Sequence, residues 1–145
     1  MSANSRFTIA VHTLAVLALS DNAVSSSFIA GSTGSNPVTI RNMLGDLRKA
    51  GLVSTTAGST GGSRLTRPAS RISLADIHQA VEQDHLFEMH YSKPDISCPI
   101  GRNIQNVLTD VYSDAFSALL AKLKITSLAD VVAGVTDLSI EQSDK

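Results

Sequence analysis

The polar residues of segment 37–49, PVTIRNMLGDLRK, have the clearest capacity for chemistry. They combine hydroxyl, amide, guanidinium and ammonium groups, which read base edges and bind phosphates in duplex DNA. Apolar residues recur among them at steps of three and four, which predicts a helix with one buried face. The polar face comprises Thr39, Arg41, Asn42, Asp46, Arg48 and Lys49. The buried face comprises Val38, Ile40, Met43, Leu44, Leu47 and, at the end, Leu52.

Helix-start and helix-stop residues set the limits of this element and of the one before it. Asn36 is a good N-cap, Pro37 suits the first helical position, and Gly51 supplies a stop. A serine run, 25–27, precedes a short helix that a glycine, Gly34, ends. We expect a helix-turn-helix whose second helix reads DNA, although a solvated amphipathic surface helix would show a similar pattern. Further candidates for phosphate contacts are Ser26, Ser27 and Ser35.

A hairpin follows the predicted reading helix. Residues 53–57 are rich in Val, Ser and Thr, residues 58–62 form a Gly-rich turn, and residues 63–67 can return as a second strand. A phosphate loop of a nucleotide-binding protein is the alternative, but the turn lacks the GK[ST] ending. The sequence therefore predicts a mainly α fold with a small β-hairpin wing, a winged helix-turn-helix. Candidate wing contacts to DNA are Ser59, Thr60, Gly61, Gly62 and Arg64.

The net charge of −1 conceals a division between the two halves of the chain. Residues 1–71 carry a net charge of +5, whereas residues 72–145 carry −6. The positive half is the half with the predicted helix-turn-helix, as expected for a surface that faces phosphates. A single cysteine excludes an intramolecular disulfide and favours a reducing, cytoplasmic location. The apolar run 9–19 is too short to span a membrane, and no secretory cleavage pattern accompanies it.

The remaining predicted elements divide the chain into four parts. A mostly buried first helix over 6–19, the helix-turn-helix, the wing and a capped helix from Ser73 to about Gln83 form a DNA-binding domain, 1–83. Residues 84–99 have mixed polarity and two prolines, and are expected to be a connecting loop. Residues 100–138 are expected to form a long helix to 124 and a short helix, and 139–145 a disordered tail. The tetrapeptide SLAD occurs at 73–76 and 127–130, which a shared helix-start requirement explains.

The long helix carries an apolar stripe that a domain this small could not cover alone. At 1.5 Å per residue the helix is roughly 35 Å long, so we expect a partner helix from a second copy, related by two-fold symmetry. The alternative is a helix that folds back on its own domain. The predicted dimer interface comprises Ile104, Leu108, Val111, Tyr112, Ala115 and Leu119.

In these residues the chain resembles the Rrf2 family of bacterial transcription regulators. The resemblance covers most of the chain and rests on RFTIAVHTLAVLAL, on the block from IAGSTGSNPVTIRNMLGDLRKAGLV through GGSRL to SLADI, and on CPIGRNI followed by TSLADV. The family includes an iron–sulfur cluster regulator, a nitric-oxide-sensing repressor and a cysteine-metabolism repressor. The resemblance implies a homodimer that binds a pseudo-palindromic operator in double-stranded DNA, with the long helices crossing at the interface.

The sequence departs from the family at the sensor. Cluster-bearing relatives have three cysteines before the long helix, and this chain has Cys98 alone. One thiolate per subunit is a poor anchor for a cluster with four protein ligands, and the spacing of His78, His85 and His90 to Cys98 matches no metal template, so we expect no cofactor and no metal. The thiol precedes the long helix, where the helix dipole favours a reactive thiolate. Cys98 is thus a candidate redox sensor or, alternatively, a small apolar packing residue.

Taken together, these features predict a homodimeric, sequence-specific transcription regulator, with repression the expected mode and redox response through Cys98 an added hypothesis. The alternative is a small-molecule-gated sensor or protein-interaction module with weak DNA affinity. Salt dependence separates the two, because DNA binding releases counterions and weakens steeply as salt rises. No catalytic residues are proposed: the sequence has no Ser/His/Asp order, no paired carboxylates in an apolar frame and no nucleotide loop. An enzyme is therefore not expected.

Overall fold

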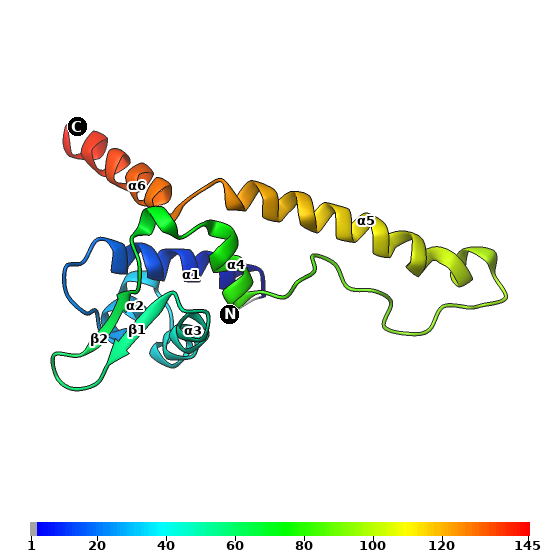
Figure 1. Cartoon of the computed structure of the whole chain (residues 1–145), viewed down its shortest axis with the longest axis horizontal. Helices are drawn as coiled ribbons and strands as arrows, with labels where there is room; N and C mark the ends of the chain where they lie inside the picture. The colour runs from blue at the N-terminus through cyan, green and yellow to red at the C-terminus, as the bar shows by residue number, and fades with distance from the viewer. Residues whose placement is uncertain (1–2) are drawn as a thin grey trace.

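A computed structural model describes residues 3–145 of the chain (Figure 1). It contains a winged domain, one long projecting helix and a C-terminal helix. The elements in chain order are α1 (Ala3–Ala18), α2 (Ser26–Thr33), α3 (Pro37–Lys49), β1 (Val53–Thr56), β2 (Gly62–Leu65), the 3-10 turn η1 (Ala69–Arg71), α4 (Leu74–Val81), α5 (Pro99–Lys124) and α6 (Leu128–Ser143). No helix within residues 3–145 has the length and apolar content to cross a membrane.

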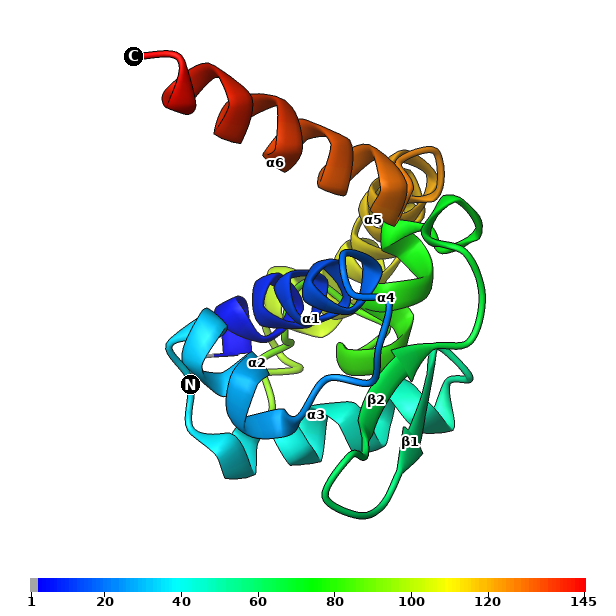
Figure 2. The same cartoon turned by 90° about the vertical axis from the view of Figure 1, so that its left-hand side faces the viewer.

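The core lies where α1, α3 and α4 meet, with α2 and the hairpin closing its sides (Figure 2). Its buried members come from α1, α2, α3, β1, α4 and the connections between them, and also from the start of α6, while Leu65 of β2 packs against the cluster. Burying each such side chain contributes about 1.5 to 3 kcal/mol, so this cluster supplies most of the stabilisation of the domain. The large side chains with no or almost no exposure are Leu14, Ile29, Ile40, Met43, Leu47, Leu52, Val53, Ile72, Ile77 and Leu128.

The predicted helix starts are confirmed by their hydrogen bonds. Asn36 Oδ1 accepts from the amide of Val38 at 2.8 Å, and Pro37 is the first residue of α3. Gly34 ends α2 in the left-handed conformation, at φ 67°. One detail of the prediction was wrong: Val38 is 53% exposed, because the first turn of α3 begins before the helix reaches the core.

The wing is a two-stranded antiparallel hairpin with a third backbone partner. Strands β1 and β2 pair Ser54 with Arg64 and Thr55 with Ser63. Val24, in the connection between α1 and α2, exchanges both backbone hydrogen bonds with Ser63, at 2.8 and 3.0 Å. This third strand approaches so closely that a Cβ on Gly62 would lie 2.4 Å from the Val24 carbonyl oxygen. Gly62 is thus required by the packing of the domain.

The two SLAD tetrapeptides lie side by side. In each, the serine hydroxyl accepts from the aspartate amide at 3.0 Å and the aspartate carboxylate accepts from the serine amide at 2.9 Å, so both form a capping box. Ser73 and Ser127 also form an antiparallel bridge. The shared helix-start explanation is confirmed, and the pairing joins the start of α4 to the start of α6.

Helix α5 extends away from the winged domain, and none of its residues is fully buried (Figure 1). Its 26 residues span about 39 Å. Residues 83–98, which form no helix or strand, run outward alongside α5 to its far end, and the ring centroids of Phe87 and Tyr112 lie 4.9 Å apart. The C-terminal part of α5 packs on α4, where Phe116 contacts His78.

The C-terminal residues differ from the predicted disordered tail. Helix α6 continues to Ser143, although its residues beyond 132 are exposed. Helical hydrogen bonding extends to the amide of Asp144, which donates to the carbonyl of Ile140, and Ser139 and Ser143 each donate from the hydroxyl to the carbonyl four residues back. The segment contains no proline and no glycine after Gly134, so nothing in its sequence stops the helix.

We expect Gly62→Ala to lower the free energy of unfolding by about 1 to 3 kcal/mol, because the new methyl group must displace the Val24 backbone at a residue whose φ is 151°. Urea denaturation of the full chain measures this change. Gly31→Ala is the matched control, since its added methyl group meets nothing within 4 Å inside a helix, where alanine is favoured. Equal stability of both variants would contradict the third-strand explanation.

Candidate DNA interface

A groove of about 380 Å³ separates α3 from the wing. Arg41 and Arg48, two turns apart on α3, line one wall, and Thr55 and Thr56 of β1 line the other. Both arginines are exposed, and no carboxylate lines the groove. Neither guanidinium group forms an ion pair within residues 3–145, and two such groups beside strand hydroxyls form a surface suited to phosphates and base edges.

Helix α3 presents three different faces. One face is buried in the core through Ile40, Met43, Leu44 and Leu47. Residues 41 and 48 face the wing groove, and residues 42 and 49, one position further around the helix, are exposed beside them. The prediction placed Asp46 on the DNA-reading face. That placement was wrong, because Asp46 turns toward α1 and forms an ion pair with Arg6.

The serine run lies at the start of α2, as expected from the sequence, and its first residue caps the helix. Ser25 is the N-cap of α2, and its hydroxyl accepts from the amide of Phe28 at 3.2 Å. Ser26 and Ser25 line the groove with the two arginines, while Ser27 is exposed on the first turn. The sequence indicated the run 25–27 as the helix start but named only Ser26 and Ser27 as DNA contacts, whereas the structure places Ser25 beside Ser26 in the groove.

Arg64 lies on the opposite side of the wing. Because Arg64 pairs with Ser54 while Ser63 pairs with Thr55, strand alternation turns Arg64 away from the face that lines the groove. Its guanidinium donates to the backbone carbonyl of Asp21 at 3.2 Å. The structure therefore separates Arg64 from Arg41 and Arg48, which the sequence had grouped with it.

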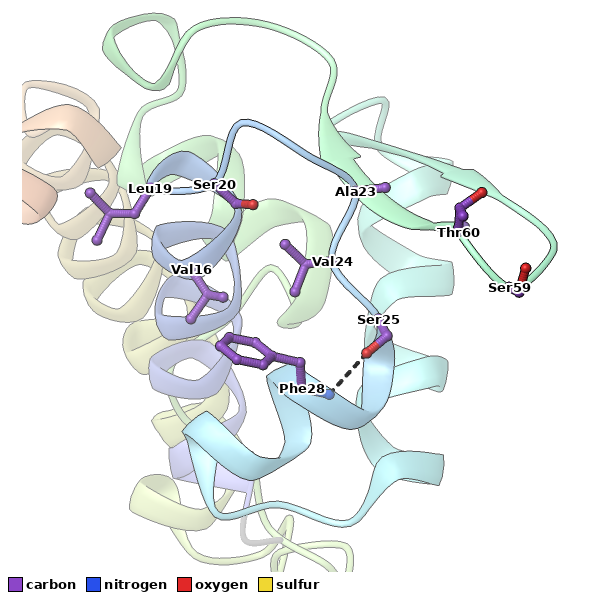
Figure 3. A pocket seen from close by; sticks show the side chains of 10 residues that line it. Val16, Leu19, Ser20, Ala23, Val24, Ser25, Phe28, Ser59 and Thr60 are labelled. Carbon is purple, nitrogen blue, oxygen red and sulfur yellow. Dashed lines mark hydrogen bonds between the residues drawn. The ribbon is translucent and has the colours of Figure 1, made fainter.

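The tip of the wing borders a second hollow, of about 690 Å³, between α1 and α2 (Figure 3). Figure 3 shows Phe28, Val16 and Leu19 on one side and the wing-turn residues Ser59 and Thr60 on the other. Gly61 lines both hollows. The wing turn thus lies between the groove and this hollow, and the predicted turn residues do not all face one surface.

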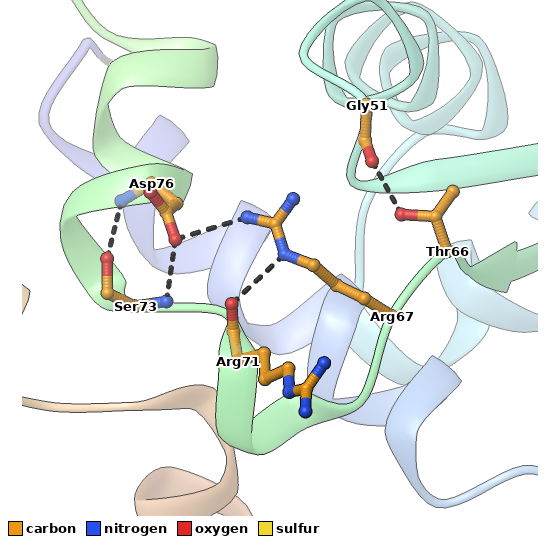
Figure 4. A network of polar contacts seen from close by, with 6 residues as sticks. All are labelled: Gly51, Thr66, Arg67, Arg71, Ser73 and Asp76. Atoms are coloured by element: carbon orange, nitrogen blue, oxygen red, sulfur yellow. Dashed lines mark hydrogen bonds and ion pairs between the residues drawn. The ribbon is translucent and has the colours of Figure 1, made fainter.

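A polar network ties the base of the wing to α4 (Figure 4). Arg67 donates to the carbonyl of Arg71 at 3.0 Å and to the carboxylate of Asp76 at 3.2 Å. The same Asp76 oxygen accepts from the amide of Ser73 in the capping box. Thr66 fixes the other edge by donating its hydroxyl to the carbonyl of Gly51, just after α3. The orientation of the wing is therefore linked to both α3 and α4.

The predicted dimer residues divide into two stripes on α5. Tyr112 contacts Phe87, and Leu119 lines a cavity against α1 and α4, so both face residues of their own chain. A second stripe is left open by the chain: Ile100, Val107 and Val111 are 71%, 59% and 53% exposed. Ile104, half-buried, and Ala115, exposed, lie on the same side at helical steps of three and four.

Cys98 is exposed and occupies the N-cap position of α5, without a side-chain capping bond. Just before it, Ser97 donates two hydrogen bonds to the Asp95 carboxylate, which lowers the pKa of Asp95. Within residues 3–145 no three histidine, cysteine or acidic side chains gather in an arrangement that could hold a metal ion. A lone exposed thiol does not fit an iron–sulfur cluster with four protein ligands.

The arrangement of helices and hairpin defines a winged helix-turn-helix DNA-binding protein. The sequence profile of the Rrf2 family, described as iron-dependent transcriptional regulators, matches residues 3–134. The chain therefore belongs to the Rrf2 family, whose members are transcriptional regulators and not enzymes.

Individual relatives agree with this assignment. The chain is 38% identical over 130 residues to "Putative HTH-type transcriptional regulator YwnA" of Bacillus subtilis (strain 168), covering 89% of this chain and 96% of that protein. A crystal structure of "a putative transcriptional regulator from Lactobacillus plantarum" is 29% identical and superposes with a TM-score of 0.73, covering 97% and 99% of the two chains. A crystal structure of "a putative DNA binding protein" is 32% identical, with a TM-score of 0.72 and coverage of 88% and 98%.

Proposed function

We propose that this Rrf2-family regulator is a homodimeric repressor that binds a specific operator in double-stranded DNA through α3. The observation that carries the proposal is the acid-free groove in which Arg41 and Arg48 face the strand hydroxyls of the wing. Arg41 lies in the N-terminal half of α3, the part of a recognition helix that reads base edges. The phosphate backbone would be bound by Arg48, two turns further along α3, and by the amides at the start of α2.

The open stripe on α5 supports the dimer. It carries apolar side chains along a helix that projects from its own domain, and such a surface on a regulator of this size favours a second copy as its partner. A two-fold dimer would present two reading helices to successive turns of DNA, which requires a pseudo-palindromic site. The chain's own coverage of Tyr112 and Leu119 removes them from the interface that we propose.

The rival function, a protein-interaction module with weak DNA affinity, predicts a different response to salt. Each phosphate that a cationic side chain neutralises releases counterions, so log affinity for DNA falls steeply with log salt concentration. The two exposed arginines of the groove favour DNA over an interaction surface, which usually has an apolar centre. Fluorescence anisotropy with selected operator DNA at several salt concentrations separates the two functions.

We expect Arg41→Ala to weaken operator binding by about 1 to 3 kcal/mol and to relax base preference, because a bidentate contact to guanine would be lost. Arg64→Ala, on the opposite face of the wing, should weaken all sequences alike and lower the salt slope by about one if the side chain binds phosphate. Anisotropy titrations on specific and scrambled duplexes measure both effects. Arg102→Ala, on the exposed surface of α5, is the control. If the Arg41 variant bound like this control, α3 would not be the reading helix.

Val111→Asp should convert the dimer to monomers. A carboxylate in the centre of an apolar interface is desolvated without a partner, so association should weaken at least about tenfold. Size-exclusion chromatography with light scattering over a range of protein concentrations measures the change. Ser113→Asp adds the same charge on another side of the helix and should leave association unchanged. Equal behaviour of the two variants would contradict the proposed interface.

Redox response through Cys98 is a second proposal, supported by the exposure of the thiol and by its place at the start of the proposed dimer helix. Oxidation there would alter the start of α5, at the end far from the winged domain, and through the dimer would reorient the two DNA-binding domains. Peroxide should then lower the operator affinity of the parent protein and leave that of Cys98→Ser unchanged. An identical peroxide response of both proteins would show that the thiol is not the sensor.

A further inference from the structure

A cavity of about 760 Å³ lies between α1, α4 and the C-terminal part of α5, and it shares no lining residue with the DNA groove. Apolar side chains from all three helices line it, among them Phe7, Val81, Leu119 and Leu123. Its volume is within the range of small-molecule sites, which combine an apolar lining with a few directed polar groups.

Two polar atoms at this cavity have no protein partner. His78 is only 9% exposed, and its Nδ1 is buried without a hydrogen bond in the described part of the chain. The edge of its ring is fixed by aromatic contacts, with centroids 5.3 Å from Phe7 and 5.8 Å from Phe116. On the next turn of chain, Glu82 Oε1 is buried and likewise unpaired. Buried polar groups are normally satisfied, so both side chains point to a ligand that supplies hydrogen bonds, which would reach them through Glu82 Oε2 and His78 Nε2 rather than through the enclosed atoms.

The charges around the cavity indicate the sign of that ligand. Arg6, the one guanidinium in the lining, already donates to the carbonyl of Val81 at 2.8 Å and pairs with Asp46 of α3. At the rim, Glu88 contacts the imidazole of His85 at 2.7 Å. Among the charged side chains of the lining, the carboxylate of Glu82 is therefore the one without a partner within residues 3–145, and it would be stabilised by a cation.

We propose that this cavity binds a small primary amine with an apolar body, whose ammonium group pairs with Glu82 while the body contacts Phe7, Leu119 and Leu123. A second hydrogen-bonding group on the ligand would satisfy His78. The inference goes beyond the proposed function by giving the regulator a class of effector. Ligand binding would affect the DNA interface through Arg6, because Arg6 lines the cavity and also forms an ion pair with Asp46 on α3.

The experiment uses the full chain without DNA, so a failure of the proposed operator binding cannot affect its result. The probe is 2-phenylethylamine, followed by calorimetry and by two-dimensional amide and methyl NMR. Uncharged 2-phenylethanol and anionic 3-phenylpropanoate have bodies of similar size and test the sign of the charge. Glu82→Gln tests the proposed ion pair, and Glu141→Gln, an exposed carboxylate on α6, is the matched control.

The amine should bind saturably and shift the NMR signals of Leu119 and Leu123. Its affinity should be at least about tenfold higher than that of the alcohol or the anion, because each of these lacks the charge-assisted contact with Glu82. Glu82→Gln should weaken it by a similar factor, and Glu141→Gln should leave it unchanged. Equal affinity for all three probes, tighter binding of the anion, or an unchanged affinity of Glu82→Gln would each overturn the proposal. The probe comparison on the parent protein decides the question even if Glu82→Gln does not fold.

Discussion

The antiparallel contact between residues 72–74 and 126–128 holds the winged domain and the C-terminal helices together. The amide of Leu74 donates to the carbonyl of Thr126 at 2.9 Å, and the amide of Leu128 donates to the carbonyl of Ile72 at 2.8 Å. Ile72 and Leu128 are both fully buried in the same core. Because α5 ends and α6 begins at this contact, it links the long helix to the DNA-binding elements, in addition to the direct packing of α5 on α4.

Two polar links connect this contact to the reading surface. Asp76 caps α4 at the contact and also accepts from Arg67 at the base of the wing, so the wing follows α4. Arg6 joins the end of α4, through the carbonyl of Val81, to Asp46 on α3. The wing and α3 are thus tied to one helix, α4, on which α5 also packs. This arrangement explains how a change at α5 could reach both walls of the groove.

Local sequence signals determined the helix starts and the hairpin, because caps and turns act over three or four residues. Asn36 and the two SLAD capping boxes are examples, and the structure has them as predicted. These local signals do not predict contacts between segments that lie far apart in the sequence. The pair of Arg6 with Asp46 spans 40 residues, and the pairing of Val24 with Ser63 requires a third strand that no alternation in residues 20–25 indicates. The side to which Arg64 turns depends on the hairpin register, which turn composition alone does not fix.

The sizes of these interactions indicate what kind of control the fold permits. An ion pair with both side chains about one-third exposed, as in Arg6 and Asp46, contributes at most about 1 kcal/mol. The four buried side chains of α3 each contribute about 1.5 to 3 kcal/mol, so loss of the pair cannot detach the helix. A change of this size lies at the lower end of typical allosteric couplings, about 1 to 3 kcal/mol, so it would bias the orientation of α3 rather than detach the helix. Asp46 lies off the face that carries Arg41 and Arg48. A change in its ion pair would therefore tilt this face of α3 without placing any group in the groove.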